Sequence, residues 1–240
     1  LRDWKPRHTL TYVRSFSQVK QANRMDAEHF QPKYKELREI IRNYPCGYLK
    51  LIDIAVNSNG TIEPRANPEH DFEYIELADI NQTIGVIENA KIIKGKDAPS
   101  RARMLLRSGD IIASSVEGSL DKVALVSEEY DGAIGSTGFF VLRPRTVSSG
   151  YLLALIKSII VREQMHCEAS GTILSAVPAK SLKNIIVPNI QQEIQDAISA
   201  LVQQSHAARR EAKTLLEKAK RAVEIAIEEG EERAMEYLNR

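Results

Sequence analysis

Residues 189–240 read NIQQEIQDAISALVQQSHAARREAKTLLEKAKRAVEIAIEEGEERAMEYLNR, and this stretch decides the fold. Apolar and small residues recur along it at alternating steps of four and three, which is the spacing of a heptad seam on one side of a helix. The seam consists of four large residues, Ile194, Ile198, Leu201 and Leu215, and six small ones, Ser205, Ala208, Ala212, Ala219, Ala222 and Ala226. The pattern predicts one long helix of roughly 70 Å at ~1.5 Å per residue.

Such a helix needs a partner to cover its seam, and alanine and serine there let two backbones approach closely. The helix could fold back on its own domain. No second helix of comparable length is evident in the sequence, so we favour a coiled coil between two chains. The residues expected at this dimer contact are Ile194, Ile198, Leu201, Ala208, Ala212, Leu215, Ala219 and Ala222. Asn189 is expected to cap the helix, with Gln192 completing a capping box.

The pattern upstream of Pro188 predicts a β-rich domain between two shorter helices, one ending near Asn43 and one spanning Gly150–Met165. Strands are expected at Tyr48–Val56, Phe72–Ile80, Thr83–Ile87, Ile111–Val116, Lys122–Ser127, Ala133–Leu142 and Asn184–Val187, with a basic loop before residue 109. The predicted fold class is therefore α+β. Residues 1–188 form the globular domain, with residues 1–24 as an N-terminal arm, and residues 189–240 form the coiled-coil helix.

Composition and motifs favour a binding protein over an enzyme. Apolar residues make up 43% of the chain and charged residues 27%, as in an ordinary folded protein, and no apolar run is long enough to span a membrane. No signal peptide opens the chain, and Cys46 and Cys167 lack CxxC spacing, so we expect reduced thiols in a cytoplasmic protein. Neither a phosphate loop nor a nucleophile elbow occurs, and the histidines lack metal-ligand spacing. The sequence NPEH at 67–70 is superficially like a methyltransferase motif, but its third residue is glutamate and no glycine-rich strand precedes it.

The charge of the chain is unevenly distributed although the net charge is only +1. Between Lys91 and Arg107 there are six basic residues and one acidic residue. Such a segment suits contact with a polyanion, although a solvated loop of lysines accounts for the pattern equally well. Basic and hydroxyl side chains in expected loops are our candidates for DNA contacts: Lys94, Lys96, Arg101, Arg103, Lys122, Thr137, Thr172 and Lys180.

Several short blocks, in order, resemble the specificity (S) subunits of type I restriction-modification systems. They are RMDAEHFQPKY at 24–34, YIELADI at 74–80, APSRAR at 98–103, SGDII at 108–112, STGF at 136–139, ASGT at 169–172 and IIVPNIQQEIQ at 185–195. The order and spacing of these blocks cover roughly residues 24–230. A full S subunit usually carries two recognition domains and two spacer helices, whereas this chain has one of each. It is either a half-subunit that must dimerise or one half of a longer protein.

The resemblance implies a DNA-recognition subunit rather than an enzyme. Residues 1–188 would be a target-recognition domain reading a half-site of double-stranded DNA, and residues 189–240 a spacer helix that sets the distance between half-sites. The partners implied are an adenine-specific methyltransferase subunit, which would carry S-adenosylmethionine, and a restriction subunit. Two alternatives remain: a coiled-coil scaffold that never touches nucleic acid, and the recognition half of a fused restriction-modification enzyme.

Overall fold

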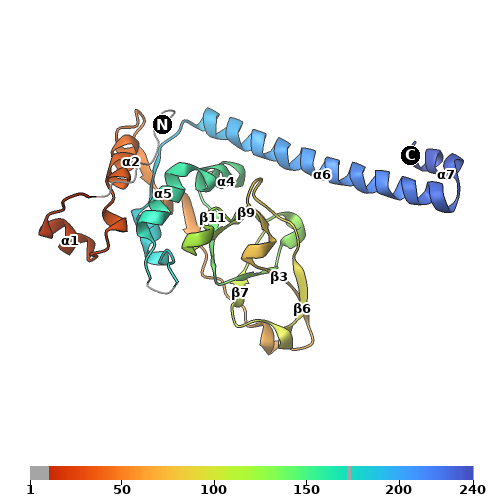
Figure 1. The fold of residues 1–240 in the computed structure, drawn as a ribbon, viewed down its shortest axis with the longest axis horizontal. Coiled ribbons are helices and arrows are strands. Elements are labelled where there is room, and N and C mark those ends of the chain that lie inside the picture. Colours follow the sequence, from red (N-terminus) through yellow and green to blue (C-terminus); the bar gives the residue numbers. More distant parts are fainter. Residues whose placement is uncertain (1–10, 172–173, 240) are drawn as a thin grey trace. The chain divides into compact units, whose positions relative to one another are not determined.

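The computed structural model describes residues 11–171 and 174–239, which fall into two compact units, one up to Ser199 and one from Ala200 onward (Figure 1). The α+β class is confirmed. The helices are α1 (Phe16–Ala22), α2 (Pro32–Arg42), α3 (Leu51–Ile54), α4 (Ser149–Lys157), α5 (Ile159–Glu168), α6 (Gln192–Glu228) and α7 (Glu231–Leu238). Short 3-10 helices are η1 (Glu28–Phe30), η2 (Pro64–Ala66), η3 (Leu77–Asp79), η4 (Gly95–Asp97), η5 (Glu117–Ser119), η6 (Glu128–Tyr130) and η7 (Ala179–Asn184).

The strands are short and form two four-stranded sheets and two strand pairs. They are β1 (Tyr48–Lys50), β2 (Ala55–Asn57), β3 (Asp71–Ile75), β4 (Ile80–Asn81), β5 (Val86–Ile87), β6 (Lys91–Lys94), β7 (Ala102–Leu105), β8 (Ile111–Ser114), β9 (Val123–Leu125), β10 (Ile134–Ser136), β11 (Phe139–Pro144) and β12 (Ile186–Pro188). One sheet has the order β2-β11-β8-β9 and the other β6-β3-β10-β7, while β1 pairs with β12 and β4 with β5.

The main core joins residues from the two larger sheets. Ile75, Leu106, Ile112, Phe139 and Val141 belong to one buried cluster in which side chains from both sheets meet. Helix α4 packs on β8, β9 and β11, and Figure 1 shows it beside β9 and β11. Burial of this apolar surface is the main favourable term that holds the short strands together.

Four predicted elements are each divided in the structure. The strand expected at Tyr48–Val56 is interrupted by α3, and the strand expected at Phe72–Ile80 is interrupted by η3, which leaves β3 and β4 in different sheets. The strand expected at Ala133–Leu142 changes sheet between β10 and β11. The helix expected at Gly150–Met165 breaks at Ser158, whose extended backbone ends α4 and caps α5. The expected basic loop contains β6 and β7. In each case pairing with a distant strand or helix overrides the local pattern.

A buried carboxylate ties the central strands of the first sheet together. Asp110 is only 1% exposed, and its two oxygens accept hydrogen bonds from Nε and Nη2 of Arg143, both at 2.9 Å. The same carboxylate accepts the backbone N–H of Arg107 at 3.1 Å, closing the turn before β8. Gly109 precedes it with φ +86°, a conformation that favours glycine. This two-point contact fixes β8 against β11.

A second cationic contact joins the start of the domain to the end of α5. The guanidinium of Arg24 donates to the carbonyl oxygens of Cys167, Glu168 and Ala169 at 3.3, 3.2 and 2.6 Å. Positive charge at a helix C-terminus is favourable, and it also satisfies carbonyls that the helix leaves unpaired. Asp26 receives two bonds from the same guanidinium, which lower the pKa of its carboxyl group. The RMD block of the sequence therefore has a structural role.

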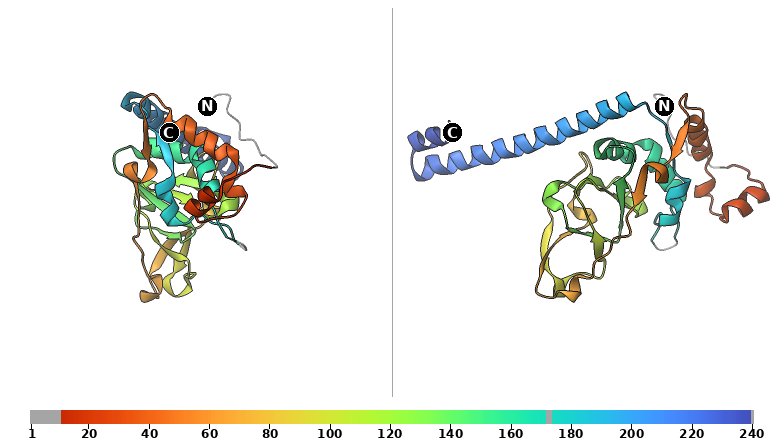
Figure 2. Two further views of the ribbon diagram at one scale, coloured as in Figure 1. Left: turned by 90° about the vertical axis from the view of Figure 1, so that its left-hand side faces the viewer. Right: turned by 180° about the vertical axis from the view of Figure 1, so that it is seen from behind.

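The long C-terminal helix is confirmed, but it is shorter than predicted at both ends. It begins at Gln192, because Asn189 bonds through its backbone N–H to Gly47 and through its side chain to Cys46, instead of capping the helix. It ends at Glu228, and Gly230 has φ +101° and ψ 162°, a region that is essentially restricted to glycine. Helix α7 then runs back along α6, as the right-hand view of Figure 2 shows. Among the described residues, no helix combines the length and apolar character needed to cross a membrane.

We predict that Asp110→Asn destabilises the chain by about 1–3 kcal/mol, because it removes charge-assisted hydrogen bonds and sets an amide against the N–H donors of Arg143 and Arg107. Urea denaturation followed by far-ultraviolet circular dichroism measures the loss. The matched control is Glu128→Gln, which alters an exposed carboxylate in the same domain. Equal unfolding midpoints for the two variants would show that the buried contact contributes nothing.

Candidate nucleic-acid interface

The predicted basic segment forms both edge strands of the second sheet, β6 and β7. Strand β6 pairs antiparallel with β3, so that Lys94 lies opposite Asp71 and Lys91 opposite Tyr74. Strand β7 follows on the far side of the same sheet, next to β10. The side chains of Lys94, Lys96 and Arg101 are between 44 and 64% exposed, and that of Arg103 is 37% exposed. The fold therefore gathers the four predicted cations around one sheet and keeps them accessible.

Each of these cations has an acidic partner that sequence reasoning missed. Lys94 lies 3.5 Å from Asp71 and 3.9 Å from Glu69, and Lys96 lies 3.0 Å from Glu69. Glu76 lies 3.7 Å from Arg101 and also pairs with Lys91, while Glu63 pairs with Arg103.

Four carboxylates thus face five cations, and the segment is far less positive in the fold than in the sequence. The positions of the acids are visible in the sequence, but their pairing with residues some 15 to 40 positions away depends on tertiary contacts. These are the register of β3 with β6 and the bridge between Thr61 and Met104 beside β7. Exposed pairs of this kind are worth about 0–1 kcal/mol each. Little energy is needed for a cation to leave its carboxylate for a phosphate oxygen, so the surface can bind a polyanion without a strong local field.

The remaining candidates for DNA contacts are distributed over the domain. Thr137 is exposed between β10 and β11, and its backbone N–H donates to the carbonyl oxygen of Arg101 at 2.8 Å, which places the two residues side by side. Lys180 is exposed in η7. Lys122 is half-buried, and its ammonium donates to the carbonyl oxygen of Ile80 at 3.0 Å. The contact joins β4 to the residue that precedes β9. Thr172 lies outside the described residues.

The NPEH sequence packs closely against the basic segment. A Cβ atom on Gly95 would lie 2.2 Å from the carbonyl oxygen of Asn67 and 2.3 Å from that of Pro64, so only glycine fits there. The backbone N–H of Lys96 donates to the carbonyl oxygen of Pro68. This turn therefore positions the basic segment. Across residues 11–171 and 174–239, no group of three or more histidine, cysteine, aspartate or glutamate side chains is placed to hold a metal ion.

The exposure of the predicted seam of α6 changes along its length. Leu201 and Leu215 are 66% and 58% exposed, and Ala208 and Ala212 are exposed as well. Towards the end of the helix, α7 covers the seam: Ala222 is 5% exposed and packs in a groove formed with Ala226 and with Ala234 of α7. The ammonium of Lys218 donates to the carbonyl oxygen of Leu238, at the end of α7. The open part of the seam therefore extends from Ile194 to about Ala219.

Solved structures with similar folds are subunits of type I restriction-modification systems. The HsdS subunit from Thermoanaerobacter tengcongensis matches 76% of this chain with 30% sequence identity and a TM-score of 0.59. A chain from a structure of the complex assembly and conformational transition of the type I R-M system matches 77% with 26% identity and a TM-score of 0.58. The resemblance carried by the sequence motifs is thereby confirmed: the structural neighbours of this chain are specificity subunits.

The chain spans slightly less than half the length of the two solved chains, 47% and 48% respectively. No protein-family model matches the sequence, and no curated protein matches it. The likeness therefore extends over slightly less than half of each solved chain.

Proposed function

We propose that this chain is a sequence-specific DNA-binding specificity subunit of a type I restriction-modification complex, whose recognition domain reads a half-site. The observation that carries the proposal is the shared fold with an HsdS subunit, at 30% identity over 76% of the chain. The accessible cations on β6, η4 and β7 provide groups that bind phosphate oxygens, and exposed Thr137 beside Arg101 adds a hydroxyl able to bind a base edge. The chain would recognise the DNA sequence, and a partner subunit would catalyse the reaction.

Two copies would read a two-part site. The matched part of this chain covers 47% and 48% of the two solved chains, and a second copy would supply a second domain of the same kind. Because a symmetric dimer places identical domains about a two-fold axis, the recognised site would be a palindrome interrupted by a spacer. Residues 1–188 act as the target-recognition domain and residues 189–240 as the spacer and dimerisation segment. The length of helix between the domains would set the spacing.

The open part of the seam fits an antiparallel pairing of two copies. If Ser205 faces Ala208 of the second copy, the same register sets Leu201 against Ala212, Ile194 against Ala219 and Ile198 against Leu215. Large residues meet small ones in the first two pairs, and two large residues meet in the third. Ala219 lines the groove beside α7, and the other positions precede the part of the seam that α7 covers. The register also places Gln204 near Glu211 and Val202 near Arg209, so no like charges face each other. This complementarity supports a homodimer through α6.

The partners would be double-stranded DNA, an adenine-specific methyltransferase subunit and a restriction subunit. The methyltransferase would bind S-adenosylmethionine and flip the target adenine, so in this proposal the partner performs the chemical step. A complex that acts on the chromosome operates in the cytoplasm.

The test is a selection of binding sites from random duplex DNA, with the chain alone and with a co-expressed methyltransferase subunit. A two-part palindrome with a fixed spacer is expected; no enrichment in either arm, with a dimer by mass, would favour the scaffold alternative.

The acid–base pairs on the second sheet predict opposite effects for two variants. Arg101→Gln should weaken duplex binding and reduce the slope of log affinity against log salt by about 1, because one phosphate contact is lost. Glu76→Gln should strengthen binding, because it releases Lys91 and Arg101 from their shared carboxylate. Fluorescence anisotropy over a salt series measures both. Glu36→Gln, an exposed acid on α2, is the control, and identical curves for all variants would remove this sheet from the interface.

The seam predicts that Ala212→Glu converts the dimer to monomers, because it places two carboxylates in the open seam where Leu201 of the second copy would pack. Ala212 is exposed in the single chain, so the change leaves the fold of each chain intact. Sedimentation velocity measures the outcome. Ala207→Glu adds the same charge to the same helix outside the seam and should remain dimeric. A persistent Ala212→Glu dimer would place the contact elsewhere.

A further inference from the structure

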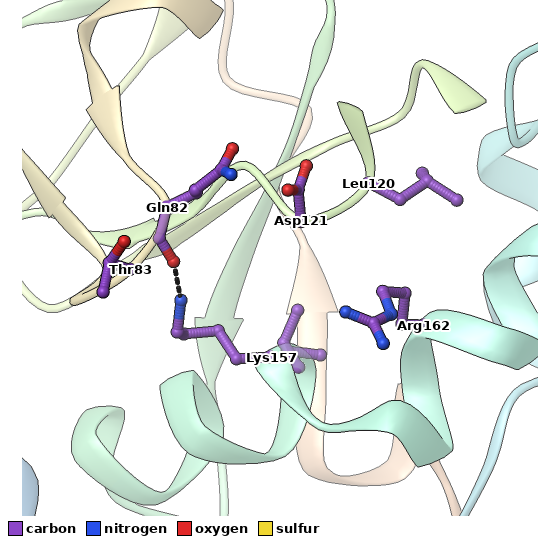
Figure 3. Close-up of a pocket in the computed structure, with 7 residues that line it drawn as sticks. Gln82, Thr83, Leu120, Asp121, Lys157 and Arg162 are labelled. Atoms are coloured by element: carbon purple, nitrogen blue, oxygen red, sulfur yellow. Dashed lines mark hydrogen bonds between the residues drawn. The ribbon is translucent and has the colours of Figure 1, made fainter. Parts of the chain in front are cut away.

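A cavity of about 230 Å³ lies in the first unit, away from the basic sheet. Figure 3 shows its lining, which comes from three places: the β4–β5 turn, the segment before β9, and the junction of α4 with α5. The polar lining residues are Gln82, Thr83, Asp121, Lys157 and Arg162. The cavity exceeds the ~30 Å³ that one water molecule occupies in the liquid, so it has room for a polyatomic ion.

Lys157 brings an incompletely neutralised charge to this cavity. Its side chain is half-buried, and its ammonium donates to the carbonyl oxygen of Gln82, a neutral partner (Figure 3). Desolvation lowers the pKa of Lys157, while the more distant Asp121 opposes that shift. The aliphatic stem passes close to Gly85, where an added Cβ would lie 3.2 Å from Cδ of Lys157. A desolvated ammonium with a neutral partner is stabilised by an anion that comes within reach.

Arg162 contributes a second cation to the same lining. Its guanidinium has no hydrogen bond or ion pair with any residue in the described part of the chain, in contrast to the paired cations of the second sheet. A planar guanidinium presents several N–H donors and binds phosphate oxygens at two points. Asp121 is the single acidic residue of the lining, so the cavity carries two positive charges and one negative charge.

We infer that this cavity holds a phosphate group, with Arg162 and Lys157 as its ligands, and that the phosphate is a backbone phosphodiester of the bound duplex. The assignment rests on the proposed function for the source of the phosphate, and on the cavity for its chemistry. The contact is made to the backbone and therefore carries no base preference. It orients the domain on the duplex from the α4–α5 side, independently of the cations on the second sheet.

Two variants with opposite expected effects on duplex binding test the inference. Arg162→Gln should reduce the slope of log affinity against log salt by about 1 and weaken duplex binding, relative to Arg145→Gln, which removes an exposed arginine outside the cavity. Asp121→Asn should strengthen binding, because it removes the one carboxylate that repels the phosphate. The measurements use the full chain, alone and with the methyltransferase subunit, and random-sequence duplexes. Far-ultraviolet circular dichroism checks that each variant is folded.

The outcomes separate this inference from the proposed function. If the unaltered chain binds duplex but Arg162→Gln behaves like Arg145→Gln, the cavity assignment is overturned and the proposed function stands. A titration with inorganic phosphate, followed by nuclear magnetic resonance of the Arg162 side chain, is the second arm. Phosphate binding by a chain that binds no duplex would identify a site for free phosphate and contradict both proposals. Binding of neither would also contradict both.

Discussion

The fold depends on the contact between Asp110 and Arg143. A carboxylate that is almost fully buried is costly unless every oxygen is paired, and Asp110 meets this condition with two guanidinium donors and one backbone N–H. The contact joins β8 to β11 at the centre of the first sheet. Ser149 at the start of α4 bonds to the carbonyl oxygen of the adjacent Gly109, so the helix is positioned from the same turn. Strand β11 follows directly after β10, which belongs to the second sheet. The contact between Asp110 and Arg143 therefore also helps to position the second sheet and its basic edge strands.

Two kinds of positive charge coexist in the domain and have different physical consequences. The cations of the second sheet are exposed and paired with acids, so they give little long-range attraction and exchange partners at small cost. Lys157 is partly desolvated, and Arg162 has no acidic partner among the residues that the structure describes, so an anion bound there would gain more per contact. A near-neutral protein can thus bind a polyanion through local exchange of ion pairs, and its affinity should depend on which carboxylates remain nearby.

The apolar surface of the long helix is covered in one part and exposed in another. Ala222 and Ile225 are covered by α7 from the same chain, whereas Leu201 and Leu215 remain in solvent. The division follows from residues near the turn: the heptad pattern ends at Ala226, the next seam positions are Glu229 and Arg233, and Gly230 permits a backbone angle that other residues resist. A helix that continued straight would carry charges along its seam. By folding back, α7 limits the uncovered part of the seam to the stretch between Ile194 and about Ala219.

Local spacing in the sequence was sufficient to predict the α+β class, the long helix, most strand positions and the family resemblance, because periodicity and turn residues act over a few neighbouring positions. The sequence did not reveal that Glu63, Glu69, Asp71 and Glu76 compensate the basic run, that residues 133–142 change sheet at Thr137, or that Lys157 and Arg162 share a cavity. Nor did it show that α7 folds back on Ala222. Each of these depends on which distant segments lie side by side, and only the packing of the sheets and helices decides that. The individual residues specified the elements and their charges; the tertiary structure decided which charges are neutralised and which remain available to a ligand.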